Sequence, residues 1–207
     1  MRRIVSSARI EGPRFWIVAG PNGSGKSSLY DQTNIESFGR SVWIINPDLL
    51  AARIRSVESL EPDAANLEAV RRIEAWLDAS IQAHQTVGVE TVLSTPKYRR
   101  LVSAAKSRKF AINLIYVLLQ SPALCVERVR LRVAKGGHDV PTQKIIDRWQ
   151  RSLDQLPWYL EQADRAWLFD NSGATPRVMG QKEKGTIFLD PDALPEIKKV
   201  AALIRTG

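Results

Sequence analysis

One octapeptide constrains the fold of this chain more than any other stretch: Gly20-Pro21-Asn22-Gly23-Ser24-Gly25-Lys26-Ser27. It fits the pattern G-x-x-x-x-G-K-[ST], and the apolar run at 14–19 before it predicts a buried strand. The residues from Ser28 onward can continue as a helix. A strand, a glycine-rich turn and a helix N-terminus together form a cradle whose backbone N–H groups donate to phosphate oxygens. The sequence therefore predicts a site for a nucleoside triphosphate.

The residues of this phosphate cradle have separable roles. Its glycines let the backbone take positive φ, which turns N–H groups toward the phosphates. Lys26 is expected to reach the β- and γ-phosphates, and the Ser27 hydroxyl is expected to ligate Mg²⁺. The nucleotide-binding residues are then Gly20, Pro21, Asn22, Gly23, Ser24, Gly25, Lys26, Ser27 and Ser28.

Strands and helices alternate along the rest of the chain. Apolar runs predict further strands at 41–45, 87–93, 110–119 and 165–170. Caps and helical spacing predict helices that begin at Pro47, Pro62, Tyr98, Pro122 and Thr142, the last continuing to about Leu156. The run 110–119 is apolar on both faces, which is typical of a central parallel strand. The sequence predicts an α/β fold of the P-loop NTPase class, a nucleotide-kinase-like parallel sheet of about five strands flanked by helices.

The two ends of the chain are expected to carry a lead-in, a small hairpin and a last helix. Residues 1–13 are interpreted as a lead-in, and 177–180 and 186–189 as a small hairpin around 181–185, before a helix from Pro191. We expect one domain over 1–207. No run reaches the roughly 20 apolar residues of a membrane span. The single cysteine permits no internal disulfide, so we expect a cytoplasmic protein.

The acids of the chain favour one class of P-loop protein. The Asn/Thr-Lys-x-Asp guanine reader of GTPases is absent, and the run 110–119 does not end in the acidic pair of a motor ATPase. Carboxylates instead end shorter elements: Asp48 comes after the second strand, and Glu90 lies within the third. A small-molecule kinase needs this arrangement, because its acceptor lies beside the γ-phosphate at the carboxyl ends of the strands.

Both acids also allow a purely structural interpretation. Asp48 is either the base that takes the proton of an acceptor hydroxyl or an acid favoured by the dipole of its helix. Glu90 has apolar neighbours in its strand, so it either faces a cleft or forms an ion pair with an arginine. In a cleft it would meet an acceptor hydroxyl or a water on Mg²⁺. Thr91 and Thr95 are candidate supporting donors to the acceptor.

Two basic stripes follow the central strand. Arg128, Arg132 and Lys135 share one helical face, and Lys144, Arg148 and Arg151 repeat that spacing beyond the hinge 136–141. The two helices within 122–156 form either a lid that closes over the triphosphate or an ordinary helix pair whose basic faces point into solvent. This segment alone accounts for much of the net charge of +8. The excess charge therefore does not require nucleic acid as the partner.

Taken in order, these motifs resemble the zeta-toxin family of P-loop kinases, in its compact bacterial branch. The likeness covers about residues 14–172 and includes the phosphate cradle, Ile45-Asn46-Pro47-Asp48, Glu90-Thr91-Val92-Leu93-Ser94, Gly136-Gly137-His138-Asp139-Val140-Pro141 and Asp170-Asn171-Ser172. The resemblance implies Mg²⁺- and ATP-dependent phosphorylation of a small-molecule hydroxyl. The family's acceptor is a UDP-activated amino sugar, and its members act as toxins restrained by a separate antitoxin protein.

By position, the resemblance also implies residue roles. Asp48 matches the catalytic base and Glu90 the acceptor-binding acid, while Asn171 falls near the nucleotide base. The phosphate-binding lid arginines correspond to Arg128, Arg132 and Arg148. This chain departs from the larger toxins in its shorter length, and Glu58, Glu61 and Glu68 all remain candidates for a second acceptor-binding acid.

Two other functions fit the same residues. A metabolite kinase of shikimate or gluconate type would use the same machinery without toxicity. A nucleic-acid-directed ATPase or polynucleotide kinase would use the basic surface, and its oligonucleotide binding would weaken steeply with salt.

Overall fold

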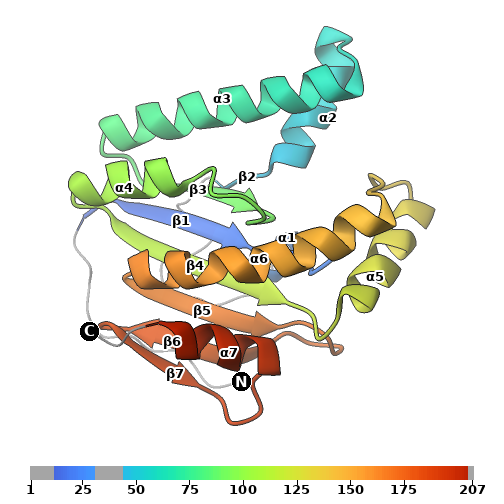
Figure 1. Ribbon diagram of the computed structural model, residues 1–207. Helices are drawn as coiled ribbons and strands as arrows, with labels where there is room; N and C mark the ends of the chain where they lie inside the picture. The colour runs from blue at the N-terminus through green and yellow to red at the C-terminus, as the bar shows by residue number, and fades with distance from the viewer. Residues whose placement is uncertain (1–11, 31–43, 205–207) are drawn as a thin grey trace.

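The computed structural model describes residues 12–30 and 44–204. In these residues one mixed sheet has the strand order β2-β3-β1-β4-β5-β6-β7 (Figure 1). Its strands are β1 (Arg14–Ala19), β2 (Ile44–Ile45), β3 (Val87–Thr91), β4 (Ala111–Leu118), β5 (Arg165–Asp170), β6 (Arg177–Glu183) and β7 (Thr186–Leu189). The first five pair in parallel, and β6 and β7 add an antiparallel hairpin at one edge. The predicted class, a parallel P-loop sheet with a C-terminal hairpin, is confirmed.

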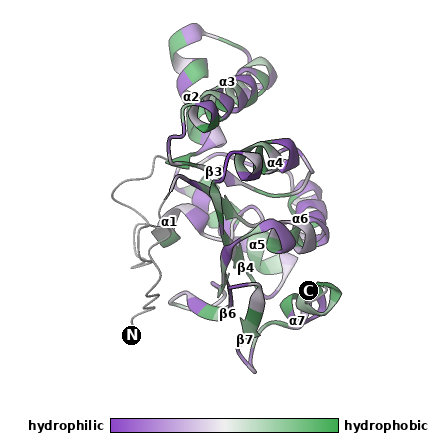
Figure 2. Ribbon diagram, turned by 90° about the vertical axis from the view of Figure 1, so that its left-hand side faces the viewer, coloured by the Kyte–Doolittle hydropathy of each residue, from purple (hydrophilic) through white to green (hydrophobic). Residues whose placement is uncertain are grey.

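Helices cover the two faces of the sheet unequally. The helices are α1 (Lys26–Tyr30), α2 (Pro47–Glu58), α3 (Pro62–Gln82), α4 (Arg99–Ser107), α5 (Pro122–Ala134), α6 (Thr142–Gln162) and α7 (Pro195–Leu203). Figure 2, which views the sheet from its edge, shows α4 to α7 on one side and α1 on the other, with α2 and α3 at the top, near β3. The larger hydrophobic cluster lies under α3 to α7, and a smaller one, with Leu29 of α1, lies on the opposite face.

The central strand β4 is buried on both faces of the sheet. Every residue of β4 is buried, and β4 lies between β1 and β5. On the α1 side, Trp16 stacks on Trp167 with ring centroids 5.7 Å apart. A strand that is apolar on both faces can occupy only a position covered on both sides, as the sequence predicted for 110–119.

Several element boundaries differ from the sequence-based expectations. α6 continues six residues past Leu156, through Pro157, because Tyr159 and Leu160 still pack into the core. β6 extends to Glu183, into the predicted turn at 181–185, because the buried Lys182 Nζ donates to the carbonyls of Leu160 (2.7 Å) and Glu161 (3.1 Å). The turn is therefore only Lys184-Gly185, both at positive φ.

The last helix begins at Pro195 instead of Pro191. Asp190 organises a turn first: its carboxylate accepts from the backbone N–H of Asp192 (2.7 Å), and its carbonyl accepts from Ala193 (2.9 Å). The described part of β2 is also shorter than the predicted strand, whose residues 41–43 lie outside the described ranges. Residues 1–11 of the lead-in and the residues after Tyr30, over which a helix was predicted to continue, also lie outside them. None of the described helices is both long and apolar enough to cross a membrane.

Candidate active site

The phosphate cradle joins β1 to α1 at the carboxyl edge of the sheet. Gly20, Gly23 and Gly25 have φ values of 144°, 78° and 84°. The space around these glycines excludes a larger residue, as their φ values do. A Cβ on Gly20 would lie 2.1 Å from the Val117 carbonyl oxygen, and a Cβ on Gly23 would lie 2.6 Å from the Cys125 carbonyl oxygen. The buried Ser24 Oγ has no hydrogen-bond partner among the described residues. A tight turn with an unsatisfied donor fits a phosphate ligand.

The close approach at Gly20 predicts a stability effect. Gly20→Ala should lower the free energy of unfolding by about 3 kcal/mol or more, because it combines positive φ with a clash against β4. Gly185→Ala is the matched control, since Gly185 also has positive φ (82°) but nothing lies within 4 Å of its added Cβ. That control should lose only about 1–2 kcal/mol. Urea unfolding measures both, and equal losses would contradict the close approach.

The cradle lysine is buried. Lys26 is 7% exposed, and its Nζ donates to the carbonyls of Gly20 (2.8 Å) and Pro21 (3.0 Å). Burial lowers the pKa of Lys26, and the negative charges of Glu90 and Asp48 act in the opposite direction. Both predicted acids are therefore electrostatic neighbours of the lysine that is expected to hold the phosphates.

Glu90 joins the cradle to α2. Its Oε2 accepts from the Ser27 hydroxyl (2.9 Å) and from the Asn46 side-chain amide (3.1 Å). The Asn46 Oδ1 simultaneously caps α2, accepting from the backbone N–H groups of Asp48 (2.9 Å) and Leu49 (3.3 Å). Asn46 thus fixes the start of α2 against the cradle, and sequence reasoning assigned it only the capping role.

Asp48 lies in the first turn of α2 and is exposed. Burial lowers the pKa of Arg148, and the charge of Asp48 opposes this effect, as it does at Lys26. The charge of the Asp48 carboxylate therefore acts on both the cradle lysine and an arginine of α6. An exposed acid in this position is accessible to a second substrate.

The three predicted lid arginines have different contacts. Arg148 Nη1 donates to the Asn22 side chain in the cradle (3.1 Å). Arg132 Nη2 donates to the His138 carbonyl in the hinge (2.7 Å), and Arg128 Nη2 lies 3.4 Å from the carbonyl oxygens of Ser172 and Gly173. Lys144 and Arg151, predicted on the same stripe as Arg148, are exposed. The two basic stripes therefore do not form one uniform surface.

A pocket of about 520 Å³ lies beside the cradle. α1, α5 and the loop 171–176 form its walls, and its lining includes Gly23, Gly25, Ser28, Arg128, Leu131, Arg132, Lys135, Asn171, Gly173, Ala174 and Pro176. The buried Asn171 side chain donates to the Ser24 carbonyl (2.8 Å), so it supports the cradle as well as lining the pocket. Sequence reasoning missed Gly173, Ala174 and Pro176 as pocket residues, since glycine, alanine and proline carry no chemical signal.

The two predicted acceptor-binding threonines have different surroundings. Thr91 Oγ1 accepts from the Leu93 backbone N–H (3.1 Å), which stabilises a turn in which Leu93 has φ 60°. Thr95 is exposed. Two of the three alternative acids are engaged elsewhere, since Glu58 and Glu68 form surface ion pairs with Arg72; the third, Glu61, is exposed at the start of α3.

The donor set next to Lys26 fits Mg²⁺ better than a transition metal. In the described part of the chain, no group of three or more His, Cys, Asp or Glu side chains could hold a metal ion. Ser27 and Glu90 instead offer two oxygen donors beside the cradle. Mg²⁺ in phosphate sites takes one or two protein oxygens and completes its shell with water and phosphate.

The fold and this site define a P-loop, kinase-like nucleotide-binding protein. More particularly, the chain belongs to the AAA domain family AAA_33, whose sequence pattern matches residues 15–156. An uncharacterised protein of Haemophilus influenzae is 27% identical over 121 residues, which are 58% of this chain and 80% of that protein.

Solved structures share the fold at low sequence identity. The structure of AvrRxo1-ORF1:-ORF2 with ATP has a TM-score of 0.69 at 13% identity; the match covers 92% of this chain and 64% of the length of that one. A chain of the PezAT chromosomal toxin–antitoxin system of Streptococcus pneumoniae has a TM-score of 0.56 at 14% identity, over 84% of this chain and 75% of that one. The Pnkp1/Rnl/Hen1 RNA repair complex contains a chain with a TM-score of 0.55 at 19% identity; the match covers 90% of this chain and 55% of that one.

Proposed function

We propose that this protein is a kinase that transfers the γ-phosphate of ATP to a hydroxyl group of a small molecule. The strongest support is the presence of two carboxylates, Glu90 and Asp48, whose charges both act on the cradle lysine Lys26. Transfer to a hydroxyl needs a carboxylate that orients the acceptor and takes its proton. One of these two acids is exposed and the other is buried against Ser27, which gives them different tasks.

The buried acid belongs to the metal side of the site. Ser27 and Glu90 are the residues that would hold Mg²⁺, which neutralises charge on the phosphate oxygens when bound. Asn46 keeps Glu90 in place through its amide. This assigns Glu90 to the metal in preference to the acceptor, one of the two cleft roles that its sequence position allowed.

The exposed acid, Asp48, is the proposed base. The acceptor oxygen forms a bond to the γ-phosphorus, the bond to the β–γ bridging oxygen breaks, and the acceptor proton passes to the Asp48 carboxylate. Lys26 and Arg148 offset the charge on the transferred group, because both lie near the cradle. Arg128 and Arg132 line the neighbouring pocket, where they would contact the nucleotide. The whole of 1–207 then acts as one kinase domain, with 122–156 as its lid.

For the acceptor, we propose a UDP-activated amino sugar, and for the biological role, a cytoplasmic toxin with a separate antitoxin. The zeta-toxin resemblance supports both, and the likeness to a chain of the PezAT toxin–antitoxin system is consistent with it. Expression in a bacterial host should arrest growth, and Asp48→Ala should relieve the arrest at equal protein level. Growth that Asp48→Ala does not restore would refute toxicity through this kinase site.

A labelling experiment identifies the acceptor. Purified protein is incubated with Mg²⁺, γ-labelled ATP and a panel of UDP-sugars, free sugars, shikimate, gluconate, nucleosides and short oligonucleotides. We expect label on a UDP-amino sugar. Label on shikimate or gluconate would favour the metabolite kinase, and label on an oligonucleotide end would favour a polynucleotide kinase; either result would refute the proposed acceptor but retain the kinase.

A further inference from the structure

The loop 171–176, here called the nucleoside loop, forms one wall of the pocket beside the phosphate cradle. It connects β5 to β6, where the chain changes from parallel to antiparallel pairing. Asp170 and Arg177 are the last cross-strand pair before it and therefore close its base. The geometry of this pair determines where the loop begins and ends.

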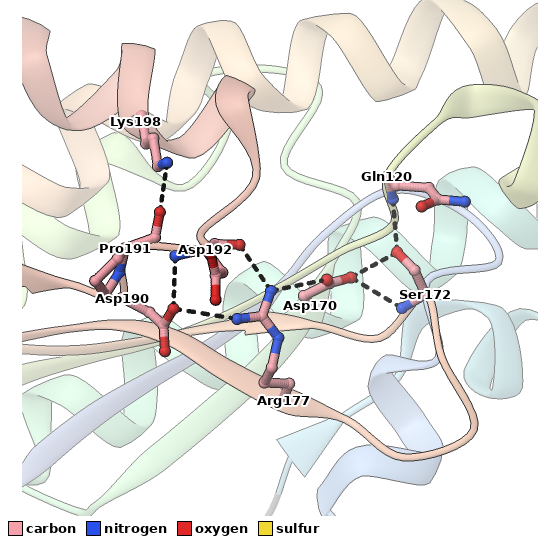
Figure 3. A network of polar contacts seen from close by, with 8 residues as sticks. All are labelled: Gln120, Asp170, Ser172, Arg177, Asp190, Pro191, Asp192 and Lys198. Carbon is pink, nitrogen blue, oxygen red and sulfur yellow. Dashed lines mark hydrogen bonds and ion pairs between the residues drawn. The ribbon is translucent and has the colours of Figure 1, made fainter.

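Asp170 fixes the first half of the nucleoside loop. Its Oδ1 accepts from both the backbone N–H (2.9 Å) and the hydroxyl (2.5 Å) of Ser172. The same Ser172 hydroxyl accepts from the Gln120 backbone N–H (2.8 Å), which follows the central strand β4 (Figure 3). The loop is thereby tied to the end of the central strand, whose residues are all buried.

Arg177 connects Asp170 to the C-terminal unit. Its guanidinium lies 3.4 Å from Asp170 Oδ2 and 3.3 Å from Asp190 Oδ1, and it donates to the Asp192 carbonyl (2.9 Å) (Figure 3). Lys198 of α7 donates to the Pro191 carbonyl in the same turn (2.6 Å). β6, β7 and α7 therefore hold the base of the nucleoside loop through one arginine.

The other side of the loop touches the cradle and the lid. Asn171 donates to the Ser24 carbonyl in the cradle, and the carbonyls of Ser172 and Gly173 lie 3.4 Å from Arg128 of α5. A displacement of the loop would change the width of the pocket between α5 and residues 173–176. The phosphate cradle could lose the Asn171 contact to Ser24 but would keep its own glycines and Lys26.

We propose that Asp170, with Arg177 and Ser172, is a positioning residue that sets the affinity of the site for the nucleoside part of ATP and not for its phosphates. This inference rests on the proposed function in one respect, namely that the pocket of about 520 Å³ holds the nucleoside. It gives the C-terminal unit β6-β7-α7, which lies beyond the matched residues 15–156, a role in nucleotide selection.

Two ligands separate nucleoside from phosphate binding. Isothermal titration with ATP and with inorganic tripolyphosphate, each with Mg²⁺, is carried out on the full chain and on Asp170→Ala. We expect the Kd for ATP to rise about five- to thirty-fold, since charged hydrogen bonds that order the loop are lost, and the Kd for tripolyphosphate to stay within about twofold. Ser172→Ala is the milder second variant and should shift the ATP value in the same direction.

The controls make each outcome decisive. Asp78→Ala removes another carboxylate–arginine pair, Asp78 with Arg100 on α3 and α4, and should change neither Kd. At saturating ATP, Asp170→Ala should keep the kcat of the chain and raise only the KM for ATP. Equal weakening of both ligands, or an unchanged ATP affinity, would overturn the positioning role. A wild-type chain that binds tripolyphosphate no more weakly than ATP would instead refute the nucleoside pocket itself, while transfer to the acceptor is tested separately by labelling.

Discussion

Asp48→Asn should leave ATP affinity within about twofold and lower phosphate transfer to the acceptor by about 100- to 10,000-fold. The amide keeps the size of the side chain but cannot take a proton from the acceptor hydroxyl. ATP should still bind, because the cradle contacts belong to other residues: Lys26 and the loop amides do not depend on Asp48 for a hydrogen bond. Single-turnover transfer and equilibrium ATP titration measure the two quantities separately.

α3 provides the matched control for this variant. Both helices open with the same dipeptide, Pro47-Asp48 in α2 and Pro62-Asp63 in α3, and each acid lies in a first turn where the helix dipole favours it. Asp63→Asn should therefore cost similar stability, a few tenths to about 1 kcal/mol, and leave transfer unchanged. If Asp48→Asn also retains transfer, Asp48 is only a helix-terminal acid and another group is the base.

Lys26→Ala should lower ATP turnover by about 100- to 1,000-fold, the size expected for loss of one charge that stabilises the transferred phosphate. Lys26 is the buried cation of the cradle, and alanine would also leave the Gly20 and Pro21 carbonyls without their donor. Turnover is measured at saturating ATP with the acceptor present, and thermal unfolding is followed on the same samples.

Lys182→Ala separates catalysis from stability. Lys182 is also a buried lysine (8% exposed) whose Nζ donates to two backbone carbonyls, those of Leu160 and Glu161 at the end of α6. Its loss should destabilise the fold but leave turnover by the folded fraction near wild type. Turnover that survives in Lys26→Ala would mean that the cradle is not the reacting site.

Local patterns allowed the fold and the cradle to be predicted from the sequence. The cradle is defined by residues adjacent in the chain, so its glycines, Lys26 and Ser27 are recognisable without tertiary information. The central strand was equally clear, since burial on both faces leaves no polar position in Ala111–Leu118 except Asn113 and the hydroxyl of Tyr116. The end of β6 was wrong because a long-range contact of Lys182 decides it, and the start of α7 was wrong because a local turn at Asp190 comes first.

The site was only partly predictable, because its geometry depends on contacts between distant elements. Asp48 could be selected as an acid that follows a strand and Glu90 as an acid near the end of one, but only the structure shows Glu90 bound to Ser27 and Asn46. The lid arginines share a helical periodicity, yet Arg148 contacts the cradle whereas Arg132 contacts the hinge. Periodicity fixes the face on which a side chain lies, and the packing of α5 against α6 fixes what that face meets.

Simultaneous measurement of ADP and of phosphorylated acceptor in one reaction tests the kinase assignment most directly. We predict that the UDP-amino sugar accelerates ADP release and that one phosphorylated sugar forms for each ADP, because the acceptor hydroxyl replaces water as the nucleophile beside Asp48. ADP release that no acceptor accelerates, with all the phosphate recovered as free inorganic phosphate, would show that the chain is an ATPase and would contradict the kinase described here.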